Sequence, residues 1–63
     1  MTVASLYARN RGWVLALAEE LDDSDEGRLA ALVVLWQCCR EYDGGSFKKF
    51  ARPRVEQALR AMA

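Results

Sequence analysis

The sequence has no histidine, a single proline and only two cysteines, Cys38 and Cys39, which are adjacent. Neighbouring cysteines form only a strained disulfide, so we expect no intrachain disulfide and a reducing compartment, the cytoplasm. Without imidazole, catalysis by a nucleophile, a histidine and an acid is excluded, and two adjacent thiols fall short of the four ligands that zinc requires. We therefore expect both cysteines to be packing residues, and we expect no metal, no cofactor and no enzymatic activity.

The sequence also lacks long apolar runs. No stretch approaches the 18 or more apolar residues that a membrane span needs, so no membrane partner is expected. The segment Trp13–Ala18 follows two arginines and resembles the apolar part of a signal peptide, but it is short and is followed at once by Glu19 and Glu20. Secretion is therefore not expected.

An excess of charge of either sign is missing as well, because nine acidic residues balance nine basic ones. The charges are nevertheless segregated: residues 22–43 carry six acids against two arginines, and residues 44–63 carry five bases against one glutamate. Two such segments should attract each other in a compact fold, or the basic tail could serve a partner. The use of arginine over lysine and the abundance of alanine favour a bacterial or phage source.

What the sequence has in abundance is helix-type periodicity, over 63 residues that allow a single small domain, residues 1–63. Thr2 can cap a first helix over about 3–21, Asp23 or Ser24 a second over about 24–43, and Ser46 a third segment over about 46–62. Pro53 predicts a break near Arg52 in that third segment. A strand through SFKKF is the competing interpretation. We expect an all-α, small three-helix bundle with two long amphipathic or apolar helices and a short, broken C-terminal helix, completed by dimerisation.

The second helix is apolar around most of its circumference. At 100° per residue, Glu26, Gln37, Arg40 and Glu41 gather in one sector together with Val33 and Ala30, and we expect this sector to face water. The remaining side chains form a bulky face (Leu29, Leu32, Leu35, Trp36, Cys39) and a seam of small residues (Gly27, Ala31, Val34, Cys38). The first helix can cover one of these faces, and a short, broken tail looks insufficient for the other. The second face is thus left to the tail, to a second copy or to another protein.

Residues spaced alternately by four and three form a heptad seam along the first helix, and Asn10 is its one polar member. The seam consists of Val3, Tyr7, Asn10, Val14, Leu17 and Leu21. A buried asparagine in such a seam can pair with its own copy across a dimer axis, or it can bond to a local carbonyl. Taking both helices together, the expected residues of the interface with a partner or with a second copy are Tyr7, Asn10, Val14, Ala31, Val34, Leu35, Trp36 and Cys38.

These patterns predict a small helical protein–protein interaction module, an adaptor, regulator or inhibitor that docks an apolar helical face on a partner protein of unknown identity and forms a homodimer. The alternative is a small nucleic-acid-binding regulator. In that case Lys48, Lys49, Arg52 and Arg54 would contact phosphates while Phe50 stacks on a base.

Overall fold

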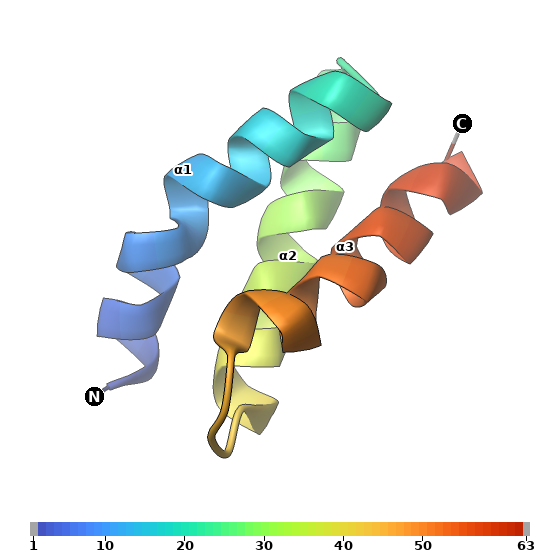
Figure 1. Cartoon of the computed structure of the whole chain (residues 1–63). Coiled ribbons are helices and arrows are strands. Elements are labelled where there is room, and N and C mark those ends of the chain that lie inside the picture. The colour runs from blue at the N-terminus through green and yellow to red at the C-terminus, as the bar shows by residue number, and fades with distance from the viewer. Residues whose placement is uncertain (1, 63) are drawn as a thin grey trace.

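The computed structural model describes residues 2–62 as three helices, α1 (Val3–Leu21), α2 (Asp25–Glu41) and α3 (Phe47–Met62). Successive helices run in opposite directions, and α2 packs against both of the others, while α1 and α3 touch each other less (Figure 1). The all-α prediction is confirmed. No strand forms among residues 2–62, so the interpretation of SFKKF as a strand is wrong.

Each helix is preceded by a residue whose side chain accepts a hydrogen bond from a backbone amide in the first turn. Thr2 Oγ1 accepts from the Ser5 amide at 3.1 Å, and Ser24 Oγ accepts from the Gly27 amide at 3.0 Å. Ser24, and not Asp23, is therefore the residue that caps α2. At α3, Ser46 Oγ lies 3.5 Å from the Lys49 amide, as expected for a residue that precedes the helix.

The connection between α2 and α3 depends on two glycines. Helix α2 ends at Glu41, two residues before the predicted end, and Gly44 and Gly45 then adopt positive φ values of 129° and 80°. Glycine alone takes this conformation without steric cost. The Tyr42 hydroxyl donates a hydrogen bond to the Gly45 carbonyl, and the Tyr42 ring packs edge-on against Phe47 at 5.3 Å between centroids. The loop is thereby tied to the first turn of α3.

Helix α3 is continuous through Pro53, so the predicted break near Arg52 does not occur. Proline inside a helix removes one backbone hydrogen bond, here the one to the Lys49 carbonyl, and costs about 3 kcal/mol. Both Lys49 and Pro53 are exposed, so water can reach that carbonyl. Val55 and Leu59 are fully buried beyond the proline, and each contributes about 1.5 to 3 kcal/mol. Burial of these two side chains offsets the cost of the proline.

The core of the bundle is continuous from α1 through α2 to α3. Its buried apolar residues are Leu6, Val14, Leu17, Ala18, Ala31, Leu35, Cys38, Cys39, Phe47, Ala51, Val55 and Leu59. The carboxyl-terminal part of the small seam of α2 faces α3, where Val34 and Cys38 lie beside Ala58 and Ala61, while Gly27 lies against Asp22. The tail therefore covers the second apolar face of α2, which is possible because α3 is unbroken and small residues let the two helices approach closely.

Candidate functional site

The core leaves one row of large apolar side chains uncovered on α2. Leu29, Val33 and Trp36 are 64%, 50% and 42% exposed. Their spacing of four and three residues places them along one side of the helix. An exposed single leucine needs no explanation, but a contiguous row of large side chains on one rigid helix is typical of an interaction surface.

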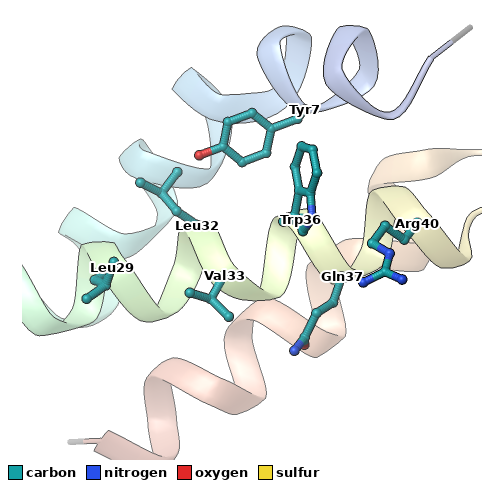
Figure 2. Close-up of a pocket in the computed structure, with 7 residues that line it drawn as sticks. All are labelled: Tyr7, Leu29, Leu32, Val33, Trp36, Gln37 and Arg40. Carbon is teal, nitrogen blue, oxygen red and sulfur yellow. The ribbon is translucent and has the colours of Figure 1, made fainter.

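Helix α1 extends this row into an open groove of about 400 Å³. Tyr7 stands beside Trp36 with the ring centroids 5.4 Å apart and the ring planes at 75°. Figure 2 shows Tyr7 on α1 facing Leu32 and Trp36 on α2, with Gln37 and Arg40 toward the carboxyl end of α2. We call this surface the outer α2 face. It consists of Tyr7, Leu29, Leu32, Val33, Trp36, Gln37 and Arg40.

Only part of the interface predicted from the sequence lies on this surface. Tyr7 and Trp36 belong to it, and Val34 is half-buried beside α3. The other five predicted residues are buried within the single chain: Asn10, Val14, Ala31, Leu35 and Cys38. These five side chains pack against the chain's own helices and offer no surface to a partner.

Asn10 bonds to a local carbonyl and not to its own copy in a second chain. Its side chain is only 8% exposed, and its amide nitrogen donates to the Leu6 carbonyl at 2.9 Å, one turn earlier on α1. This bond satisfies a donor of the buried amide inside the chain. Asn10 therefore has no need of a second copy.

Leu29, Leu32, Val33, Gln37 and Arg40 were missed as site residues by the sequence analysis. The helical wheel assigned Leu29 and Leu32 to a face that a neighbouring helix would cover, and it assigned Val33, Gln37 and Arg40 to water. The feature of the sequence that indicates this site is the edge between the bulky face and the polar sector, which Leu29, Val33 and Trp36 follow. Side chains at such an edge remain exposed once a single neighbouring helix has packed alongside.

The two cysteines lie in the core between helices. Both are free thiols with 1% and 4% exposure, and burial raises the pKa of each from its ordinary value near 9.0. For Cys38, the nearby Arg54 partly opposes this rise. Raised pKa values keep the thiols protonated and unreactive at neutral pH. Among residues 2–62, no three histidine, cysteine or acidic side chains come together as metal ligands.

The basic residues of the tail do not share one surface. Arg52 lies toward α1, beside Trp13 and Glu20, whereas Arg54 lies toward α2, beside Cys38 and Glu41. Lys48 sits over the Trp13 ring at 5.5 Å from its centroid, and Lys49 is exposed. A nucleic-acid interface needs several cations on one face, and here they are divided between two sides of α3.

Phe50 is also not free to stack on a base. Its ring lies under the Arg54 guanidinium at 4.4 Å and packs against Tyr42 and Phe47 at 6.4 and 6.5 Å between centroids. Arg52 in turn lies 3.5 Å from Glu56 on the next turn. These contacts use the aromatic ring and part of the positive charge for the tail's own packing.

Comparison of the chain with models of protein families, with curated protein sequences and with solved structures finds no match. No helix within residues 2–62 is both long enough and apolar enough to span a membrane. The geometry of the chain's own surface is thus the basis for a functional proposal.

Proposed function

We propose that the chain is a small helical protein–protein interaction module, an adaptor, regulator or inhibitor, that docks on its partner through the outer α2 face. The observation that carries this proposal is the exposed row of Leu29, Val33 and Trp36 beside a core that is complete without it. The exposed parts of these side chains lie outside the core, and docking would remove their apolar surface from water.

The shape of the surface favours a helix as the docked element. Apolar side chains spaced by three and four residues on α2, with Tyr7 forming a wall on one side, make a shallow groove along the helix axis. An amphipathic helix presents apolar side chains with the same spacing and can lie in such a groove. Trp36 and Tyr7 are the anchors we expect, because aromatic side chains dominate binding energy at protein interfaces.

The proposal is tested by capture of proteins from the native host with the wild-type chain and two variants. Val33→Glu places a carboxylate in the centre of the outer α2 face, at a position exposed enough to leave folding intact. Ala16→Glu is the matched control, because it adds the same charge at an exposed position of α1 beside α3. We expect a partner that the wild-type chain and Ala16→Glu retain and that Val33→Glu loses.

Two results would contradict this function. The first is retention of the same partners by Val33→Glu. The second is binding of random duplex DNA much more tightly than the micromolar range of non-specific contact, with affinity falling steeply as salt is added. That result would favour the nucleic-acid alternative through Lys48, Lys49, Arg52 and Arg54.

A further inference from the structure

The outer α2 face carries a charge pattern that is complementary to itself. Glu26 lies seven residues before Val33, and Arg40 lies seven residues after it. Seven residues are about two helical turns, so the three side chains form one row with a spacing of about 10.5 Å. Read from the amino end of α2, the row is negative, apolar and positive.

Both charges of this row lie in the terminal turns of α2, where they suit the helix dipole, and neither forms an ion pair within residues 2–62. Glu26 and Arg40 are both exposed. Arg28, by contrast, lies 2.6 Å from Asp23 and 3.3 Å from Asp25. The two ends of the outer row therefore remain available to charges on another molecule.

We propose that a second copy of this chain occupies the outer α2 face, with the two α2 helices antiparallel around a two-fold axis at Val33. The inference rests on the docking role proposed above and names the partner. In this arrangement Glu26 of each copy meets Arg40 of the other, because both lie at equal distance from the axis. A parallel pair would instead oppose like charges at both ends.

The apolar side chains fit the same symmetry. Leu29 and Trp36 lie on the edge of the row nearer to α1, on opposite sides of Val33 along the helix axis. A two-fold axis at Val33 therefore places Trp36 of each copy against Leu29 of the other. Ala30 and Gln37 form the opposite edge, where the small side chain of Ala30 permits close approach. The seven-residue spacing is that of helices that cross at about 20°.

A second copy satisfies the requirements of this surface without a further molecule. The partner must be a helix with an apolar centre, an acid about two turns to one side and a base about two turns to the other. Helix α2 has this pattern, and a symmetric dimer uses one surface patch twice. The row that the folded monomer leaves exposed is then covered by the same row of the second copy.

Sedimentation equilibrium of charge-reversed variants tests the proposal. We expect the wild-type chain to dimerise, and we expect Glu26→Arg and Arg40→Glu each to raise the dimer dissociation constant about tenfold by turning two attractive pairs into repulsive ones. An equimolar mixture of these two variants should regain wild-type affinity as a heterodimer, because every Arg then faces a Glu. Circular dichroism of each variant confirms that the helices are intact.

Val33→Glu should be monomeric and folded, whereas Ala16→Glu should dimerise like the wild-type chain. A wild-type chain that remains monomeric at hundreds of micromolar would overturn the dimer, and so would a mixture that associates no better than its components. The docking function can fail independently of the dimer. If Val33→Glu dissociates the dimer but captures the same host proteins as the wild-type chain, self-association is supported and docking on another protein is contradicted. Loss of host proteins by Val33→Glu from a monomeric wild-type chain would do the reverse.

Discussion

Tyr7 on α1 and Trp36 on α2 meet edge to face, with ring centroids 5.4 Å apart and ring planes at 75°. This pair joins the packed interior to the outer α2 face, because one side of Trp36 contacts Tyr7 while 42% of the residue remains exposed. An indole held in one orientation loses little conformational freedom on docking. The contact with Tyr7 therefore holds Trp36 in a fixed orientation, which suits the anchor role that we propose for it.

A double-mutant cycle measures the coupling within this pair. Tyr7→Ala and Trp36→Ala should each lower the free energy of unfolding, and the double variant should lose less than the sum of the two. The expected coupling is about 0.5 to 1.5 kcal/mol, the range for aromatic pairs. Urea unfolding of the four proteins provides the values, and strictly additive losses would show that the ring contact contributes nothing.

Two glycines in helices should respond in opposite ways to alanine. A Cβ atom at Gly12 would meet nothing within 4 Å, so Gly12→Ala should raise the free energy of unfolding by about 1 kcal/mol. A Cβ atom at Gly27 would lie 2.8 Å from the Asp22 carbonyl oxygen, which is backbone and cannot move aside cheaply. Gly27→Ala should therefore lower the melting temperature, and stabilisation by both substitutions would refute this account of the α1–α2 connection.

Replacement of the helical proline should stabilise the chain. Pro53→Ala restores the amide that can donate to the Lys49 carbonyl, and it should raise the free energy of unfolding by about 1 to 3 kcal/mol, since the loss of proline's rigidity in the unfolded chain offsets part of the gain. Thermal unfolding with Arg52→Ala as the neighbouring control provides the comparison. A destabilised Pro53→Ala chain would mean that the proline shapes α3 in a way the fold requires.

The buried thiols predict a loss of stability at alkaline pH. Burial raises the pKa of Cys38 and Cys39 above the ordinary value near 9.0, so the unfolded chain releases the thiol protons at lower pH than the folded chain does. The contribution of the buried thiols to the free energy of unfolding is thus fully present below the ordinary pKa and is lost as pH rises through the raised pKa values. The measured quantity is the difference in the free energy of unfolding from a Cys38→Ala/Cys39→Ala variant, which isolates the contribution of the thiols. In urea unfolding, the free energy of unfolding of the wild-type chain should fall more steeply with alkaline pH than that of the variant. Parallel dependence on pH in the two chains would contradict the prediction.

The helices themselves could be predicted from local sequence because their limits depend on local contacts. Thr2, Ser24 and Ser46 precede the three helices, and Gly44 and Gly45 end the second in conformations that other residues avoid. Pro53 misled the prediction, because local chemistry favours a break there. The burial of Val55 and Leu59 against the other helices decides the outcome, and this is a tertiary effect.

The candidate site was harder to predict, because exposure depends on how far each neighbour reaches around α2. The sequence indicated that α2 has two apolar faces, but it left open whether the tail would cover the second. With α3 packed beside Val34 and Cys38, the large apolar side chains of α2 that stay exposed are those along the edge between the bulky face and the polar sector, Leu29, Val33 and Trp36. Asn10 likewise fits a heptad seam in the sequence, but its own Leu6 carbonyl satisfies it.

The central claim is that the chain meets another protein chain, a second copy, through the outer α2 face. The most direct test is a dilution series followed by ¹H–¹⁵N correlation spectra, in which the two tryptophan side chains report from different places: Trp36 on the outer α2 face and Trp13 beside α3. The account predicts that the Trp36 indole and the amides of Leu29 and Val33 shift with concentration while the Trp13 indole stays constant. Spectra that do not change with concentration, or changes confined to Trp13 and the basic residues of α3, would contradict it.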